Sequence, residues 1–123
     1  MSSDVQMADN LSFMRDFHPL TPDEQTTLDS ARAALQSIAS VPCTACRYCV
    51  PVCPKHIRIP EIFSVMNQYS MFGDLSRART DYSWRTSGTR ASDCSQCHRC
   101  ESACPQHLPI PSLLSTVSLT LEP

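Results

Sequence analysis

The residues of this chain that are best suited to chemistry are its cysteines, which fall into two runs of identical spacing. Each run reads C-x2-C-x2-C-x3-C-P, and the two runs together contain all eight cysteines of the 123-residue chain. The first run begins at Cys43 and the second at Cys94, so a shift of 51 residues superimposes them. Because only two copies are present, the repeat predicts a pseudo-twofold pair of equivalent sites rather than a solenoid.

This spacing is suited to binding iron–sulfur clusters. Three cysteines within seven residues can curl around one 4Fe-4S cubane and reach three of its iron atoms, and the fourth iron needs a ligand from elsewhere. In two-cluster ferredoxins with this spacing, the fourth cysteine of each run binds the cluster of the other run. We therefore predict two 4Fe-4S clusters with crossed ligands. The predicted ligands are Cys43, Cys46, Cys49 and Cys104 for the first cluster, and Cys94, Cys97, Cys100 and Cys53 for the second.

Other uses of the cysteines fit the sequence less well. Two C-x2-C pairs can form a four-thiolate zinc site, but zinc leaves the third close cysteine of each run without a role. A disulfide framework is disfavoured because the sequence shows no secretory signal and the cytoplasm keeps thiols reduced. The segment from Cys94 to His98 matches the C-x-x-C-H signal for haem attachment, but the equivalent position of the first run holds Arg47.

Composition and charge narrow the class of protein. The formal net charge is −2 and the basic residues are scattered singly, so we expect no nucleic-acid partner. No apolar stretch approaches the roughly 20 residues of a membrane span, and we expect a cytoplasmic location without a membrane span. Only 25 of the 123 residues are Leu, Ile, Val or Phe, a low share for an ordinary core. We expect metal ligation to supply part of the stability.

The elements that must position the two runs read as helices. Thr21-Pro22-Asp23-Glu24 combines an N-cap, a proline in the first turn and a capping-box acid, which predicts a helix that ends before Pro42. Its expected apolar face contains Leu28, Ala31, Leu35 and Ile38. A short helix is also expected over residues 5–14.

The stretch between the runs and the stretch after them also have helical periodicity. We expect a helix from near Pro60 to about Gly73, one from about Asp74, and a last one from near Pro111. Their expected inward residues are Ile62, Phe63, Met66 and Tyr69, then Leu75, Ala78 and Tyr82, then Leu113, Leu114 and Val117. No alternating strand pattern of useful length is present, so the predicted fold class is all-α.

His56 and His107 occupy equivalent places three residues after the fourth cysteine of each run. They could donate a hydrogen bond to a cluster sulfur and tune its potential. The simpler interpretation, which we favour, is that each histidine closes the turn before the following helix.

Beyond the spacing, the text around the runs resembles a known family. The segments VPCTACRYCVPVCPKHIRIPEIFSVMNQY, FGD, ARTDYSWRT and ASDCSQCHRCESACPQHLPIPSLL are similar to the C-terminal iron–sulfur extension of bacterial and archaeal aldo/keto reductases. The resemblance covers about residues 1–118. It implies an α-helical ferredoxin-type domain over residues 21–123, with residues 1–20 as a linker or a remnant of a preceding (β/α)8 barrel.

The resemblance also implies partners: an aldo/keto reductase-type catalytic domain, in the same chain or a separate one, and a redox carrier. The catalytic Asp, Tyr, Lys and His of that family lie in the barrel. The only lysine of this chain is Lys55, inside the cluster segment, and the chain has no glycine-rich nucleotide loop. We therefore predict cluster ligands and no catalytic residues. The leading hypothesis is an electron-transfer module of an oxidoreductase, and the alternative is a small helical interaction domain in which the clusters are structural staples.

Overall fold

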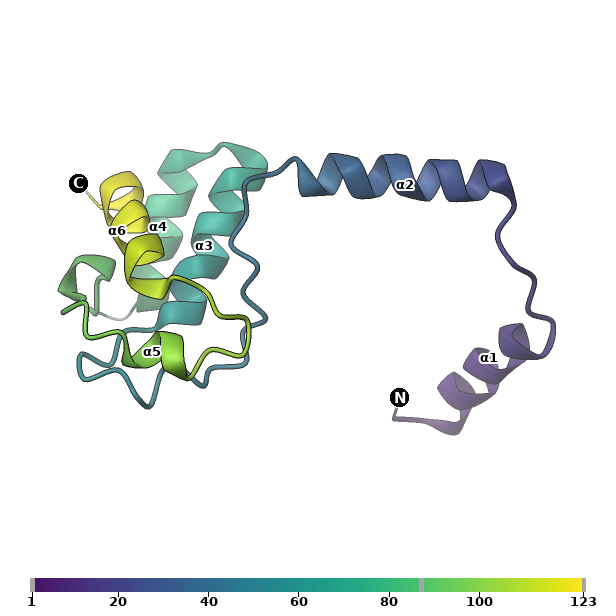
Figure 1. Cartoon of the computed structure of the whole chain (residues 1–123), viewed down its shortest axis with the longest axis horizontal. Coiled ribbons are helices and arrows are strands. Elements are labelled where there is room, and N and C mark those ends of the chain that lie inside the picture. Colours follow the sequence, from purple (N-terminus) through teal and green to yellow (C-terminus); the bar gives the residue numbers. More distant parts are fainter. Residues whose placement is uncertain (1, 87, 123) are drawn as a thin grey trace. The chain divides into compact units, whose positions relative to one another are not determined.

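A computed structural model describes residues 2–86 and 88–122 of the chain (Figure 1). Its contacts divide the chain into two compact units, Met1–Ser37 and Ile38–Pro123. The described residues contain helices, one 3-10 turn and loops, with no strand. The all-α prediction is confirmed. No helix in the described residues is long and apolar enough to cross a membrane.

The first unit consists of two helices joined by a short linker. Helix α1 spans Asp4–Arg15 and α2 spans Pro22–Gln36. The capping box predicted for α2 is present, because the Thr21 hydroxyl accepts a hydrogen bond from the Glu24 backbone N–H at 3.3 Å and the Glu24 carboxylate accepts one from the Thr21 N–H at 2.8 Å. No residue of either helix is buried. Local capping therefore defines these helices, and the expected apolar face of α2 is not covered.

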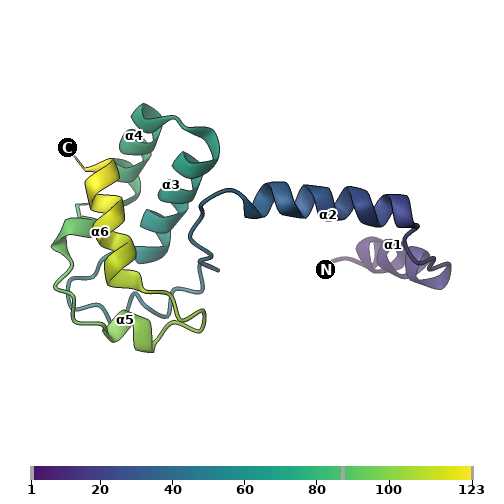
Figure 2. The ribbon, with the colours of Figure 1, turned by 45° about the horizontal axis from the view of Figure 1, so that its top comes forward.

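The second unit carries both cysteine runs and five further elements. Helix α3 spans Ile59–Phe72, α4 spans Leu75–Thr86 and α6 spans Ile110–Leu121. The shorter elements are the 3-10 turn η1 at Ala91–Asp93 and helix α5 at Arg99–Ser102. Helices α3, α4 and α6 contact one another, and Figure 2 shows them side by side, with α5 and the loops of the cysteine runs at one end.

Local sequence explains how α3 turns into α4. Gly73 ends α3 with a φ of 71°, a left-handed conformation that glycine adopts without steric cost, and its N–H donates to the Tyr69 carbonyl at 2.8 Å. The side chain of Asp74 then accepts a hydrogen bond from the Arg77 N–H at 2.9 Å, which satisfies one free donor at the start of α4. Helices α3 and α4 therefore form a tight helical hairpin and contact each other.

The core of this unit is small but fully closed. Its largest side chains, each less than 2% exposed, are Ile57, Ile59, Ile62, Phe63, Val65, Ile110, Leu114, Val117 and Leu121. Burying one such side chain contributes about 1.5–3 kcal/mol. Three cysteines, Cys49, Cys53 and Cys100, belong to the same cluster of buried residues. The core and the cysteine runs are therefore one continuous body.

Candidate metal centre

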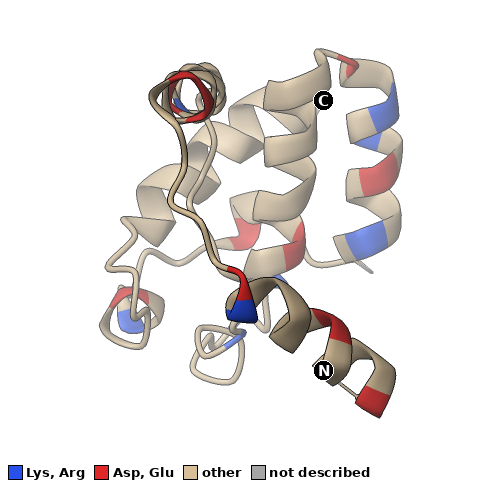
Figure 3. Ribbon diagram, turned by 90° about the vertical axis from the view of Figure 1, so that its right-hand side faces the viewer, with Lys and Arg blue, Asp and Glu red and all other residues tan. Residues whose placement is uncertain are grey.

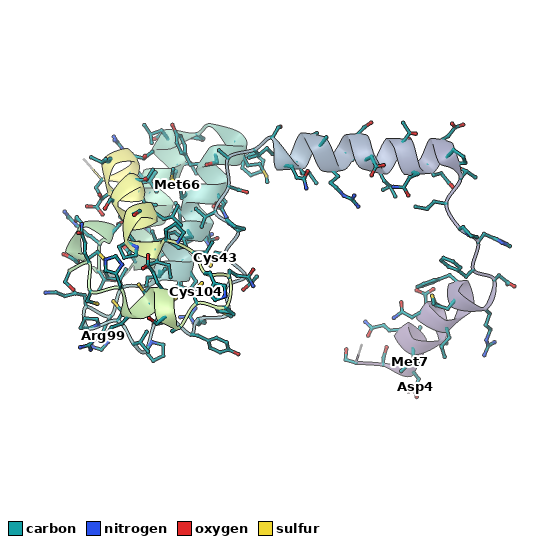
Figure 4. The ribbon with its side chains drawn as sticks, in the orientation of Figure 1. Asp4, Met7, Cys43, Met66, Arg99 and Cys104 are labelled. Carbon is teal, nitrogen blue, oxygen red and sulfur yellow. The ribbon has the colours of Figure 1, made fainter. Side chains whose placement is uncertain are left out.

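The first candidate site is a cavity that both cysteine runs line. Its walls include Cys43, Cys46 and Cys49 from the first run and Cys104 from the second. Figure 4 shows Cys43 and Cys104 close together although 61 positions separate them in the chain. We call this space the first cavity. It brings together the four cysteines predicted for the first cluster.

The second candidate site repeats this arrangement with the roles of the runs exchanged. Its walls include Cys94, Cys97 and Cys100 from the second run and Cys53 from the first. We call it the second cavity. Most of its other lining residues are also related to those of the first cavity by the 51-residue shift: Ser95 corresponds to Thr44, His98 to Arg47, Lys55 to Gln106, Ile57 to Leu108, Pro111 to Pro60 and Leu114 to Phe63. The pseudo-twofold repeat of the sequence is therefore also a repeat of the two cavities.

The backbone of each run is held in an unusual conformation around its second cysteine. Ala45 and Arg47, on either side of Cys46, have φ values of 55° and 67°, and Gln96 and His98, on either side of Cys97, have 54° and 60°. A left-handed conformation costs a non-glycine residue roughly 1–2 kcal/mol. Alternating right- and left-handed residues turn successive N–H groups inward, a nest that binds anions such as iron–sulfur clusters.

The backbone N–H groups already point to the cysteine sulfurs. The Gln96 N–H donates to Cys94 Sγ at 3.4 Å. A hydrogen bond from the Arg99 backbone N–H, together with the charge of the Arg99 side chain, lowers the pKa of the exposed Cys97 thiol. Hydrogen bonds to thiolate sulfurs stabilise the ligand form of cysteine and tune cluster potential.

The third cysteine of each run lies deeper. Burial, with the neighbouring thiols adding to it, raises the pKa of Cys49 and of Cys100 to about 11. Cys49 also senses the charge of Cys100, and Cys100 senses that of Cys53. Ile59 lines both cavities, so the two cavities adjoin. Buried thiols need a cation to become thiolates, and coordination to iron supplies one.

Helix α3 anchors the start of the first run. The Asn67 side chain accepts a hydrogen bond from the Val41 N–H at 2.7 Å and donates one to the Val41 carbonyl at 2.8 Å. Val41 lies two residues before Cys43, so this paired contact fixes the backbone just ahead of the first cysteine. Sequence periodicity placed Asn67 on a helix but gave no sign of this contact.

Ser92 lies two residues before Cys94 and is the position equivalent to Val41. Other residues anchor it. The Tyr82 hydroxyl of α4 donates to Glu122 Oε1 at 2.6 Å and accepts from the Ala91 N–H at 2.6 Å, while the Ser92 N–H donates to the same carboxylate at 3.2 Å. Burial and the adjacent carboxylate raise the pKa of Tyr82. Burial opposes ionisation of Glu122, but the hydrogen bonds from Ser92 and Tyr82 outweigh it and hold that pKa below its usual value.

We expect Tyr82→Phe to destabilise the second unit by about 1–3 kcal/mol, because it leaves the buried Ala91 N–H without its acceptor. Each kcal/mol lowers the melting temperature of a domain of this size by about 4–8 °C. Near-UV circular dichroism of the cluster-loaded protein at a fixed heating rate measures the change. Tyr48→Phe is the matched control, since Tyr48 is 62% exposed. Equal melting temperatures for the two variants would contradict the anchoring role of Tyr82.

Charged side chains also border the cavities. The Arg47 guanidinium, beside the first cavity, forms an ion pair with Glu61 of α3. His98, beside the second, contacts Glu101 at 2.7 Å through Nδ1. Blue and red segments are interspersed along the helices and loops in Figure 3.

The two histidines after the runs close turns, as we favoured. His56 and His107 are exposed and left-handed, with φ values of 53° and 51°. Their N–H groups donate to the carbonyls of Cys53 and Cys104, each at 3.0 Å. Histidine is among the residues enriched in the left-handed region, which explains its use at both positions.

The donor set of each cavity fits a cluster. Four cysteines line each cavity, and in the second cavity the Gln96 N–H donates to Cys94 Sγ. In the described residues no three His, Cys, Asp or Glu side chains are gathered closely enough to hold one metal ion. A 4Fe-4S cluster instead binds each thiolate to a different iron atom, so its ligands do not need to meet at one point.

Comparison with known proteins gives the family. A family model described as a 4Fe-4S dicluster domain matches residues 42–109, more than half of the chain and the whole of both cysteine runs. No curated protein and no solved structure matches the chain. The chain belongs to the 4Fe-4S dicluster domain family, and its eight cysteines fit two 4Fe-4S clusters.

Proposed function

We propose that this chain is an electron-transfer module in which each cavity holds one 4Fe-4S cluster. Cys43, Cys46, Cys49 and Cys104 bind the cluster of the first cavity, and Cys94, Cys97, Cys100 and Cys53 bind that of the second. When bound, such clusters take up and release one electron each. The observation that carries the proposal is the pair of adjoining cavities, each lined by four cysteines drawn from both runs.

The difference in exposure among the cysteines supports a path for electrons that enters and leaves at exposed cysteines and passes buried ones. Cys49 and Cys100 are 7% and 6% exposed, whereas Cys46 and Cys97 are exposed to solvent. Each cavity therefore has one buried and one exposed cysteine in its wall, and the exposed cysteine offers that cavity a route to an external partner. An electron that enters beside Cys46 can thus leave beside Cys97, or the reverse.

We further propose that the module serves an aldo/keto reductase-like oxidoreductase in the cytoplasm and exchanges electrons with a redox carrier. The support is the resemblance of the text within and between the cysteine runs to the extension of that family. In this proposal residues 1–20 are a linker or a remnant of the preceding barrel, and the dicluster domain spans residues 21–123.

A second candidate function is structural. Cys49, Cys53 and Cys100 belong to the buried core, so cluster binding also stabilises the fold. If stabilisation were their only role, the clusters would act as staples of a small interaction domain. Reversible reduction distinguishes the two functions, because a staple has no need to change its charge.

Anaerobic reconstitution with iron and sulfide tests the proposal. We expect about eight iron and eight sulfide ions per chain, four of each for one cluster, and reversible reduction in a potentiometric titration followed by electron paramagnetic resonance. About four iron ions per chain would reject two clusters. Eight iron ions without reversible reduction would favour the structural role.

A further inference from the structure

The two cavities differ in charge, although their cysteines and apolar walls are equivalent. The differences lie at three pairs of positions related by the 51-residue shift. Gln106 and Arg47 line the first cavity where Lys55 and His98 line the second. The third pair, Tyr48 and Arg99, directly follows the lining residues Arg47 and His98 in the sequence. Two of these pairs place a permanent cation beside the second cavity and an uncharged side chain beside the first.

The one permanent cation that lines the first cavity is neutralised nearby. Arg47 forms an ion pair with Glu61, so the two side chains together add no net charge. The neighbouring Tyr48 and the lining residue Gln106 are uncharged at neutral pH. Arg47 with its partner Glu61, Tyr48 and Gln106 therefore add no net charge beside the first cavity.

The second cavity keeps an excess of positive charge. Lys55 lines it directly and forms no ion pair with any residue that the structure describes. Arg99 lies two residues after Cys97 and projects from the loop end of the unit in Figure 4. His98 and Glu101 together carry no net charge when the imidazole is protonated and one negative charge when it is neutral.

Three further charges lie at the residues just ahead of Cys94. Asp93 and Arg90 have opposite signs, and the Asp93 carboxylate accepts the Arg90 N–H at 2.7 Å, so together they add none. The Glu122 carboxylate, which accepts the Ser92 N–H at 3.2 Å, offsets one of the cations. The difference that remains at the cavity walls is Lys55, which lines the second cavity without an ion pair where the first has the uncharged Gln106. Gaining an electron makes a cluster more negative, and a nearby cation favours that form over the oxidised one.

We propose that Lys55 and Arg99 make the second cavity the site of higher reduction potential, so that one electron supplied to the module comes to rest there. The inference rests on the proposed ligand sets and on the electron-transfer function. In the step concerned an external one-electron reductant loses one electron, the iron–sulfur core in the second cavity changes from 2+ to 1+, and no bond is made or broken.

Exchange of the equivalent residues tests the proposal. The reconstituted chain and its Lys55→Gln and Gln106→Lys variants are titrated with dithionite, and their two midpoint potentials are read by electron paramagnetic resonance. We expect Lys55→Gln to lower the higher midpoint and Gln106→Lys to raise the lower one, each by about threefold to tenfold in the reduction equilibrium, where tenfold is 59 mV for one electron. Arg99→Tyr acts in the same direction as Lys55→Gln.

Charge-conserving and salt controls separate this effect from a change in structure. Lys55→Arg keeps the charge and should leave both midpoints in place. The shifts should shrink between 0.1 M and 1 M salt, because the screening length falls from about 10 Å to about 3 Å and Lys55 is exposed.

The outcomes identify which proposal fails. The inference would be overturned if Lys55→Gln shifted the lower midpoint, or if Lys55→Gln and Gln106→Lys shifted one and the same midpoint. Either result would leave the proposed electron transfer intact. Unchanged midpoints in all variants would do the same. Clusters that accept no electron in the unmodified chain would overturn the proposed function and this inference together.

Discussion

Replacement of Cys53 by serine is expected to remove the cluster of the second run, although Cys53 belongs to the first. Cys53 lines the second cavity beside Cys94, Cys97 and Cys100. Its loss leaves one iron atom of that cluster without a thiolate, in a position that is 9% exposed. We expect iron to fall from about eight to about four ions per chain after reconstitution. Cys104→Ser should have the matching effect on the first cavity.

Two double variants with equal numbers of substitutions show which cysteines share a cluster. Crossed ligation places Cys53 with Cys97, so Cys53→Ser combined with Cys97→Ser damages one cluster and retains about four iron ions per chain. Cys53→Ser combined with Cys46→Ser damages both clusters and retains almost none. If each run instead bound its own cluster, the iron contents of these two double variants would be exchanged.

Removal of the clusters is expected to unfold the unit from Ile38 onward. In zinc-finger peptides, metal binding supplies about 10–16 kcal/mol of apparent free energy, which is as large as the 5–15 kcal/mol by which whole domains are stable. Three cysteines belong to the core here, and without iron their buried thiols leave two cavities. We expect the apoprotein to lose its near-UV circular dichroism and its cooperative thermal transition.

Reversal provides the control for this experiment. Anaerobic addition of iron and sulfide to the apoprotein should restore both signals, whereas zinc alone should not, because one zinc ion binds four thiolates that converge on a single point. A cooperative transition in the metal-free chain at an unchanged temperature would show that the helical core is sufficient by itself.

Local sequence signals predicted the main helices because each helix is defined by nearby residues. Gly73 ends α3, and Thr21 and Glu24 cap α2, as the sequence indicated. Periodicity also identified Ile62, Phe63, Leu114 and Val117 as core residues. The short elements α5 and η1 were not predicted, since four and three residues are too few to show a period.

Contacts between distant residues could not be predicted from these signals. Tyr82 and Glu122 are 40 residues apart, and Asn67 and Val41 are 26 residues apart. Periodicity shows which residues share a helix face, but it does not show what covers that face. The apolar residues Leu28 and Leu35 of α2 illustrate this limit, because they are 49% and 65% exposed. The domain boundary after residue 20 stays a prediction.

The left-handed residues of the cysteine runs were also missed. A sequence-based search for left-handed backbone looks for glycine, and this chain has only two, Gly73 and Gly88. The nests use Ala45, Gln96 and other side-chain-bearing residues instead. One available signal was the repeat itself, since a backbone conformation needed at one site is needed at the equivalent position of the other.

The mixed lining of the cavities determines when during synthesis the sites can be completed. Ribosomes release the chain from its N-terminal end, and the first cavity obtains a wall from Cys104 while the second obtains one from Cys53. Neither site has all its cysteines until residue 104 has emerged. A nascent chain that carries only the first run therefore exposes four thiols with no complete site to hold a cluster. In this arrangement, cluster insertion must follow the emergence of residue 104.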